Sequence, residues 1–261
     1  MRSRLVAFLL ILAAGCDQPP VDWREPAAIP APPAGSHLIV DSSGVAKFVE
    51  ALFHPATLPA SDPATCQSSV QTVVGAPHVY AVWWSVRPDS SAVLRYASSA
   101  DSGKTWGNAA AVDTSDVSSR GCSRPPPSLT AVGDDMYVAY SMIAPEGTGV
   151  FFAHTMSSML HSPVAVIYGD RLVGTSIAAE GAGDRVAVAY EEPNGKREQI
   201  ELALSTTEGH IFEVHSTATR DVDVATMPSV AIAGPAIAVS WLERPLDATA
   251  TSRIVRVGRI K

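Results

Sequence analysis

The sequence has few charged residues, few aromatic residues and very little cysteine. Charged residues make up 17% of the 261 residues and apolar residues 46%, which excludes wholesale disorder and provides enough apolar surface for a core. The formal net charge is −7. It argues against nucleic-acid binding, which requires a basic surface. No apolar run after the N-terminal segment approaches 18 residues, so we expect no spanning helix there.

Short motifs of catalysis and metal binding are also absent. There is no CxxC and no HExxH, and the seven histidines are scattered along the chain, so we expect no metal site. There is no GxSxG nucleophile and no phosphate-binding glycine loop. GAGDRV at 181–186 precedes a strand pattern and not a helix, so it is interpreted as a hairpin turn. No cofactor is expected.

The first 16 residues have the pattern of an export signal. Two arginines precede a short apolar run and a small-residue pair before Cys16. The sequence LAAGC at 12–16 resembles the lipobox of bacterial lipoproteins. The resemblance implies that residues 1–15 are removed and that Cys16 is lipidated, which would anchor an exported protein to a membrane of the bacterial cell envelope, on its periplasmic or surface face. The alternative is an ordinary secretory signal.

Two segments lie between the export signal and the repeats that begin at Cys66. Residues 16–36 carry the lipidated cysteine and a run rich in proline and alanine, which predicts an extended tether. Residues 43–53 place apolar side chains at helical spacing, with Ser43 as a candidate cap, which predicts one short N-terminal helix.

From Cys66 onward a unit of roughly 50 residues recurs. Each copy has an apolar strand, a glycine-centred turn and a second strand that ends in an aromatic residue. The four aromatic residues are Trp84, Tyr140, Tyr190 and Trp241. The spacing predicts a repeated antiparallel sheet.

A second landmark, SSADSGKTW at 98–106, supports the repeat. It contains S-x-D-x-G-x-T-W, and its degenerate copy STTEGHIF at 205–212 follows Tyr190 at the distance at which the first follows Trp84. The motif resembles the Asp box of BNR-repeat proteins, the sialidase-like β-propellers. The resemblance implies a structural hairpin between the third and fourth strands of a blade, formed by Ser99, Asp101, Gly103, Thr105 and Trp106.

The expected fold is therefore all-β, a β-propeller of four-stranded antiparallel blades over residues 37–261. Four blades are favoured. A fifth would require a partial blade from residues 37–65, and an incomplete ring that closes by dimerisation is the third alternative. The last copy is too short for a fourth strand, so SHLIV at 36–40 is expected to supply it.

Propeller topology places Cys66 and Cys122 beside each other, each before the innermost strand of adjacent blades, which predicts a disulfide; the alternative is two unrelated thiols. The same face collects the ligand-binding candidates. They are Arg124, Arg171, Arg220, Arg87, Asp89, Glu191 and Arg244.

Three functions fit these features. Arginine suits carboxylate or phosphate recognition, and in sialidases three arginines bind the sialic acid carboxylate. The Arg-Ile-Pro motif of active sialidases is absent, and no catalytic residue is assigned. A non-catalytic tethered propeller that binds a glycan or an envelope protein is preferred, and enzyme activity stays open. The alternatives are a sialidase-like glycoside hydrolase and a structural component of an envelope assembly.

Overall fold

A computed structural model describes residues 19–50, 55, 57, 62–181, 184–195, 198–220, 224–245 and 249–261. The export signal and Cys16 lie outside these residues. Within the described part, strands account for nearly all regular structure, and the helical content is 3₁₀, with one complete turn at Gln67–Ser69. No helix there combines the length and apolarity needed to cross a membrane.

Four antiparallel sheets follow one another along the chain. Blade 1 consists of β5 (Gln71–Val74), β6 (Val79–Val86), β7 (Ala92–Ser99) and β8 (Ala110–Asp113). Blade 2 consists of β9 (Ser128–Val132), β10 (Asp135–Ala144), β11 (Gly147–Met156) and an outer edge shared by β12 (Met159–Leu160) and β13 (Val164–Gly169).

Blades 3 and 4 repeat the arrangement. Blade 3 consists of β14 (Thr175–Glu180), β15 (Arg185–Glu191), β16 (Ile200–Ser205) and β17 (Val214–Thr217). Blade 4 consists of β18 (Val224–Ala233), β19 (Ala236–Arg244), β20 (Ser252–Ile260) and an outer edge shared by β1 (Val21–Trp23) and β2 (Ala27–Ile29).

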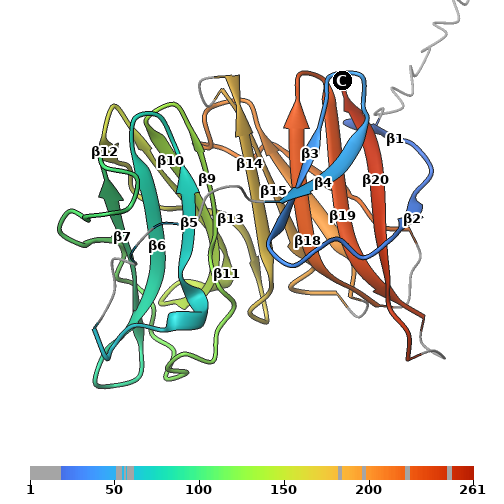
Figure 1. Cartoon of the computed structure of the whole chain (residues 1–261). Coiled ribbons are helices and arrows are strands. Elements are labelled where there is room, and N and C mark those ends of the chain that lie inside the picture. The colour runs from blue at the N-terminus through green and yellow to red at the C-terminus, as the bar shows by residue number, and fades with distance from the viewer. Residues whose placement is uncertain are drawn as a thin grey trace, which may run out of the picture.

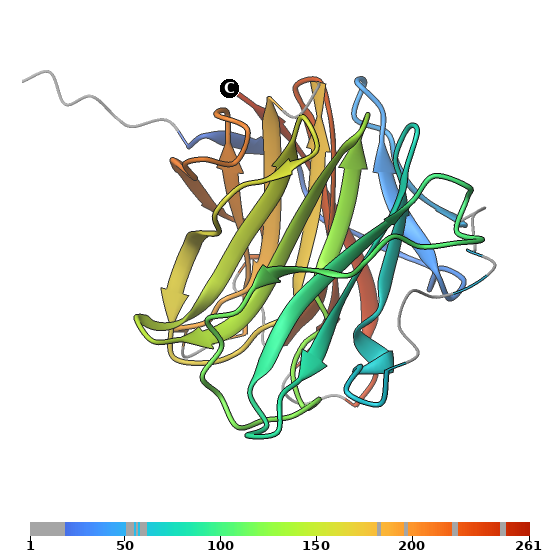
Figure 2. The same cartoon turned by 90° about the vertical axis from the view of Figure 1, so that its left-hand side faces the viewer.

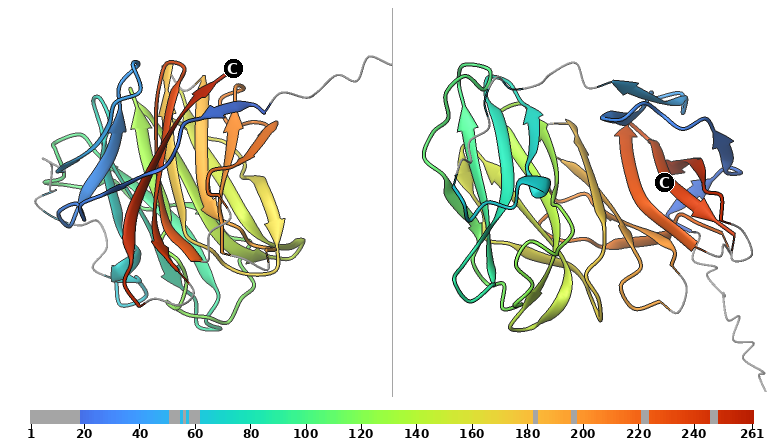
Figure 3. Two further views of the ribbon diagram at one scale, coloured as in Figure 1. Left: turned by 90° about the vertical axis from the view of Figure 1, so that its right-hand side faces the viewer. Right: turned by 60° about the horizontal axis from the view of Figure 1, so that its bottom comes forward.

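The blades lie side by side in the order of the chain (Figure 1). The first strands β5, β9, β14 and β18 contact one another in that sequence. Figure 2 shows the strands of successive blades running in nearly the same direction, and the right-hand view of Figure 3 shows the sheets following an arc from cyan through green and yellow to red. The predicted all-β propeller architecture is confirmed.

The recurring aromatic residues occupy equivalent places. Trp84, Tyr140, Tyr190 and Trp241 lie on the second strands β6, β10, β15 and β19. All four side chains are buried. Burial of such a large apolar ring contributes roughly 1.5–3 kcal/mol, so the same position stabilises every blade and explains the sequence repeat.

The core consists of apolar layers between neighbouring blades. Trp84 and Leu94 of blade 1 pack with Tyr140 of blade 2, and the ring centroids of Trp84 and Tyr140 are 5.9 Å apart, edge to face. A second layer joins blades 2 and 3 through Phe152 and Val188. A third joins blades 3 and 4. Each blade is therefore stabilised by the next one.

The outer edge of blade 4 differs from the expectation. SHLIV at 36–40 does not supply it; the tether segment does, because β1 and β2 both pair with β20. Val21 is 1% exposed and packs in the layer between blades 3 and 4. The Trp23 ring contacts the Arg256 guanidinium. The folded unit therefore begins before residue 37.

The expected helix over 43–53 is wrong where the structure describes it. Residues 46–50 form β4 (Ala46–Glu50), paired with β3 (Ser36–Val40), and residues 51–53 lie outside the described part. Asp41 holds the turn, because its Oδ1 accepts hydrogen bonds from the Ser43 and Val45 N–H groups, and Gly44 has φ +85°. Strand pairing therefore outweighs the helical spacing of the apolar residues.

The β3–β4 hairpin packs beside blade 4. Leu38 and Val40 lie in one apolar cluster with Ala231 and Ala238, and the left-hand view of Figure 3 shows the hairpin in blue against the red strands. The hairpin thus stands at the position of a partial fifth blade.

The predicted disulfide is present. Cys66 and Cys122 are joined, with 5.3 Å between their Cα atoms. Cys66 precedes β5 and Cys122 precedes β9, so the bond links the loops that lead into blades 1 and 2. A covalent link over 56 residues restricts the unfolded chain and so favours the folded one.

Candidate functional site

Strand direction divides the loops between two faces of the molecule. One face carries the loops before each first strand and those between second and third strands; we call it the arginine face, since Arg87, Arg124, Arg171 and Arg220 lie there. The opposite face carries the hairpins between third and fourth strands, and we call it the Asp-box face. In Figure 1 the arginine face is the lower end of the molecule, where the cyan helical turn lies. The Asp-box face is the upper end, where β12 lies.

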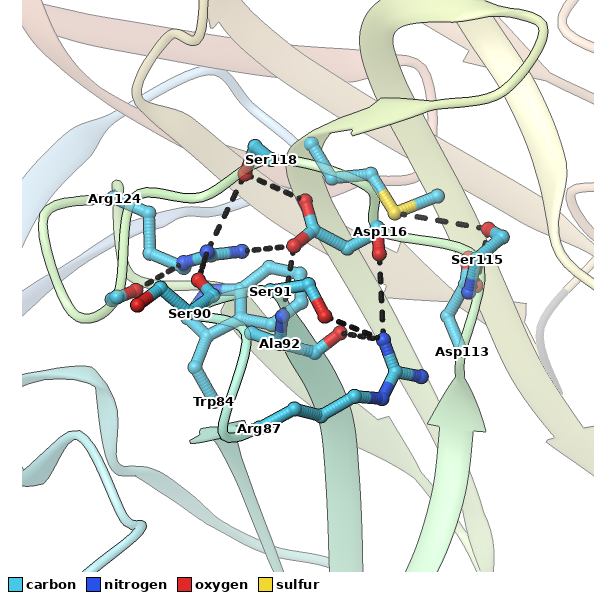
Figure 4. A network of polar contacts seen from close by, with 12 residues as sticks. Trp84, Arg87, Ser90, Ser91, Ala92, Asp113, Ser115, Asp116, Ser118 and Arg124 are labelled. Atoms are coloured by element: carbon cyan, nitrogen blue, oxygen red, sulfur yellow. Dashed lines mark hydrogen bonds and ion pairs between the residues drawn. The ribbon is translucent and has the colours of Figure 1, made fainter.

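The Arg124 side chain is buried on the arginine face, and its partners are residues of the protein itself. Its Nη1 lies 2.9 Å from Asp116 Oδ2, and both side chains are 1% exposed. Its Nε donates to the Gly121 carbonyl, and its guanidinium lies 5.2 Å from the centre of the Trp84 ring. Figure 4 shows this cluster. Because these partners surround the guanidinium, Arg124 stabilises the loop and is not available to a ligand.

Arg87 binds the neighbouring loop in the same network (Figure 4). Its Nη2 donates to the Thr114 carbonyl at 2.6 Å, and its Nη1 to the Ser91 hydroxyl and the Asp116 carbonyl. Asp89 organises the turn beside it. Hydrogen bonds from the Ser91 hydroxyl and N–H lower the pKa of the Asp89 carboxyl. Arg87 and Asp89 therefore both stabilise the backbone of the loops around them.

The candidates of blade 3 are engaged as well. The Glu191 carboxylate accepts from the N–H groups of Gly174 and Met227, which ties blade 3 to blade 4. Arg171 donates twice to the Glu192 carbonyl and lies 3.5 Å from Glu198. It is partly exposed.

Arg220 has the most open surroundings of the three arginines that precede first strands. It forms an ion pair with Glu25, and its side chain is 47% exposed. With Gln199, Thr217 and Thr219 it lines a shallow depression of about 720 Å³. Arg244, the last residue of β19, is half-buried.

A better enclosed cleft lies between blades 1 and 2. Its volume is about 300 Å³, the lower end of the range for small-molecule pockets. Carboxylates, aromatic rings and small apolar groups line it: Asp113, Ser115, Met142, Glu146, Phe151, Pro163, Ala165 and Tyr168. Glu146 is exposed and Tyr168 is 47% exposed. The Tyr168 and Phe151 rings pack edge to face, with 6.0 Å between their centroids.

Asp113, a buried carboxylate in the lining of this cleft, is held in one orientation. Its Oδ1 accepts from the Ser115 hydroxyl and N–H, and its Oδ2 accepts from the Tyr140 hydroxyl at 2.5 Å. Burial, followed by the charge of Asp113, raises the pKa of Tyr140 well above its ordinary value, so the phenol keeps its proton. The carboxylate is thus an acceptor held in a fixed orientation.

The Asp box forms the expected hairpin on the opposite face, between β7 and β8. Asp101 Oδ1 accepts from the Thr105 and Lys104 N–H groups and the Ser99 hydroxyl, and Oδ2 accepts from the Thr105 hydroxyl at 2.7 Å. Bonds from the Thr105 N–H, the Thr105 hydroxyl and the Ser99 hydroxyl lower the pKa of Asp101 to about 2. Gly103 has φ +78°. The box is a structural turn.

Trp106 completes this turn. Its indole N–H donates to the Thr57 carbonyl at 3.1 Å, and its ring packs beside Trp83 and Ala97 of blade 1. All five residues of the box are thus accounted for by the hairpin and its packing.

The degenerate box at 205–212 has the same fold. The Gly209 N–H donates to the Ser205 hydroxyl at 3.0 Å, as the Gly103 N–H donates to Ser99 at 2.8 Å. Thr207 stands in the place of Asp101, and its hydroxyl accepts from the Ile211 N–H.

The structure does not bring the predicted arginines into one cluster of shared contacts. Arg87 and Arg124 share contacts with Asp116. Arg171 is bound by Glu192 and Glu198 of a neighbouring loop, and Arg220 pairs with Glu25 of the N-terminal segment. Sequence reasoning missed Asp113 and Asp116, which hold the loop between blades 1 and 2. A signal for them exists. Aspartate followed two residues later by serine bonds its own turn at four places, Asp41–Ser43, Asp89–Ser91, Asp113–Ser115 and Asp116–Ser118.

Comparison with known proteins supports the architecture. No family model and no curated protein matches the chain. Among solved structures, the Hadza microbial sialidase is similar, with a TM-score of 0.50 and 12% identity over 72% of this chain and 43% of that one. The chain has a sialidase-type propeller fold.

Two further structures are similar to this propeller. The Trypanosoma rangeli sialidase has a TM-score of 0.48 and 12% identity over 88% of this chain and 42% of that one. The α-L-arabinofuranosidase from Fusarium graminearum has a TM-score of 0.43 and 13% identity over 70% of this chain and 72% of that one. The chain spans less than half the length of the two sialidases.

Proposed function

We propose that the chain is an exported, membrane-tethered propeller that binds a carbohydrate in the cleft between blades 1 and 2 without hydrolysing it. The carrying observation is the composition of that cleft, in which carboxylates and aromatic rings share a volume of about 300 Å³. Carboxylates accept hydrogen bonds from sugar hydroxyls, and aromatic faces pack on the apolar face of a sugar ring. A fold shared with a sialidase makes a carbohydrate the first ligand to test.

Binding is favoured over hydrolysis by the contacts of the charged groups. Retaining and inverting glycosidases use a pair of carboxyl groups that flank the scissile bond. Asp113 already accepts three hydrogen bonds, and Arg124 is enclosed by Asp116 and Trp84. Asp113 is thus held as a hydrogen-bond acceptor and not as a mobile nucleophile, and Arg124 cannot reach the carboxylate of a substrate.

The test is a glycan array probed with the full chain, followed by calorimetric titration of each sugar that binds. Tyr168→Ala and Glu146→Gln remove a ring and a charge from the cleft, and we expect each to weaken binding at least tenfold. Glu50→Gln changes an exposed carboxylate on β4 and is expected to leave binding unchanged. Equal affinity in all three variants, or no sugar bound, would overturn the proposal.

The hydrolase alternative has its own assay. Cleavage of a fluorogenic sialoside by the full chain would favour it. Arg220→Ala is the arginine variant to use because Arg220 lines an open depression. Arg124→Ala would leave Asp116 as an unpaired buried charge, a change that costs about 3–5 kcal/mol, so a loss of activity there would not identify a binding residue.

The membrane tether rests on the lipobox at 12–16, and the fold bears on its geometry. Because β1 begins at Val21, only residues 17–20 would separate a lipidated Cys16 from the propeller. Val21 pairs with Ile260 at the end of β20, a third strand that ends on the Asp-box face. That face would lie toward the membrane. The cleft would point away from it, because its lining residue Glu146 lies in the turn between β10 and β11, on the arginine face.

The tether is tested by membrane fractionation of cells that express the full chain. We expect the wild type in the membrane fraction, labelled by a fatty-acid analogue, and Cys16→Ser unlabelled and released. An unlabelled wild-type chain would refute the anchor while leaving the carbohydrate proposal intact.

A further inference from the structure

Three histidines meet on the Asp-box face. His154 lies near the end of β11, and His161 follows β12, so both belong to the outer hairpin of blade 2. His210 belongs to the degenerate Asp box of blade 3. Scattered in the sequence, they come together because blades 2 and 3 pack side by side.

Their geometry is close. One ring nitrogen of each histidine lies within 4.8 Å of one from each of the others. The His154 and His161 rings are stacked with centroids 4.9 Å apart, and the His210 centroid lies 5.1 Å from His154 and 5.6 Å from His161. The backbone fixes the first pair, since the His161 N–H donates to the His154 carbonyl at 2.9 Å.

His154 is the observation that points to a ligand. Its residue is 3% exposed, and its Nε2 is buried without a hydrogen-bond partner in the part of the chain that the structure describes. The rings of Tyr137 and Phe152 stack on it and hold it in place. A buried polar atom without a partner is destabilising, and a bound ion at this imidazole can offset that loss.

We propose that His154, His161 and His210 bind one divalent transition-metal ion, with Zn²⁺ as the closest match, and that the ion joins blade 2 to blade 3. Imidazole nitrogen suits zinc, copper and nickel, whereas Mg²⁺ and Ca²⁺ require oxygen ligands. Three imidazoles leave one position of a tetrahedral ion for water.

The three histidine side chains are buried to different extents, and this lets their rings move close enough to bind one ion. Zinc–nitrogen bonds of about 2.0–2.1 Å bring tetrahedral ligand atoms to within about 3.4 Å of each other. The rings must therefore approach by roughly an ångström from the spacing in the structure. His154 is buried, while His161 is half-buried and His210 is exposed, so the two outer rings can turn toward the fixed one.

The test is calorimetric titration of Zn²⁺, with Mg²⁺ as the comparison ion, into the full chain after chelation and dialysis. We expect one Zn²⁺ per chain and no binding of Mg²⁺. His210→Ala and His161→Ala each remove one ligand. We expect each to weaken binding by at least about 100-fold, since loss of an outer-shell partner alone costs 10–100-fold.

His37→Ala is the matched control, because His37 is an exposed histidine on β3; it should bind Zn²⁺ as the wild type does. His210→Lys installs the residue that the first Asp box carries at this position, Lys104, and separates loss of the ligand from damage to the turn. Zn²⁺ should raise the melting temperature of the wild type and His37→Ala only. No stoichiometric binding, or equal affinity in His210→Lys and wild type, would overturn the proposal.

Discussion

The two Asp boxes are the same hairpin held by different chemistry. In the first, the carboxylate of Asp101 gathers bonds from Ser99, Lys104 and Thr105. In the second, the hydroxyl of Thr207 retains two such bonds, one with the Ser205 hydroxyl and one from the Ile211 N–H. The backbone survives this loss because the serine and the glycine at positive φ are kept in both boxes. The comparison teaches that serine and glycine define the turn and that aspartate reinforces it.

The boxes also differ in what they touch. A Cβ on Gly103 would lie 2.6 Å from Pro55, while one on Gly209 would lie 2.1 Å from the ring of Phe152. Phe152 belongs to the core between blades 2 and 3. The first box therefore closes a blade edge under a surface segment, and the second is wedged against the core of its neighbour.

The largest expected effect comes from filling the two glycine positions. Gly209→Ala combines a strained φ with overpacking against a buried ring, and we expect a loss of about 3–5 kcal/mol in the free energy of unfolding. Gly103→Ala meets the partly exposed Pro55, and about 1–3 kcal/mol is expected. Urea unfolding followed by tryptophan fluorescence measures both. A reversed order would show that the second box is not seated on the core.

The next largest effect is the pH dependence of the free energy of unfolding that Asp101 causes. Its folded pKa of about 2 lies below the unfolded value of about 3.9. Between these values the unfolded chain binds more protons, so stability rises with pH through this window. The stabilisation is complete above about pH 4 and is lost as pH falls through about 2.

Asp101→Asn isolates this contribution. We expect the variant to be less stable than the wild type at pH 7 and the gap to narrow steadily in urea titrations between pH 4 and pH 2. A gap that is constant with pH would mean that the carboxylate charge does not hold the turn.

A smaller gain is expected from restoring the missing carboxylate. Thr207→Asp places an acceptor where the backbone of the second box can donate to it, as Thr105 donates to Asp101. We expect a gain of roughly 0.5–1 kcal/mol, measured by the same unfolding assay. A clear loss of stability would show that the two boxes are not equivalent in geometry.

For the last variant we expect no change in Zn²⁺ binding. Lys104→His gives the first box the histidine of the second, but its surroundings supply Pro55 and Thr57 in place of two histidines. In a His210→Ala background it should not restore Zn²⁺ binding in calorimetry. Restored binding would show that the blade 2 hairpin is not needed for the site.

The sequence predicted the features that repeat. The four aromatic positions, the first box and the disulfide partners could be located because each recurs or occupies a defined place in a blade. The helix at 43–53 was wrong, because the apolar spacing carries no information on the pairing of β4 with β3. The outer strands from residues 21–29 were missed, because proline-rich composition concealed short segments that pair with the far end of the chain.

The candidate site was harder to foresee. Arginine type and loop position predicted that Arg124 and Arg87 share one face of the molecule, but their partners Asp116 and Thr114 depend on how the loop before blade 2 folds back. The histidines of the Asp-box face come from two blades. Contacts of this kind are set by tertiary packing and have no short sequence signature.

One measurement tests the central claim that the Asp-box face stabilises the propeller while the opposite cleft binds its ligand. Titration of an array-identified sugar into Asp101→Asn and Tyr168→Ala, each held well below its unfolding temperature, compares the two faces directly. We expect Asp101→Asn to bind within twofold of the wild type and Tyr168→Ala to bind at least tenfold more weakly. Lost binding in Asp101→Asn with full binding in Tyr168→Ala would contradict the claim.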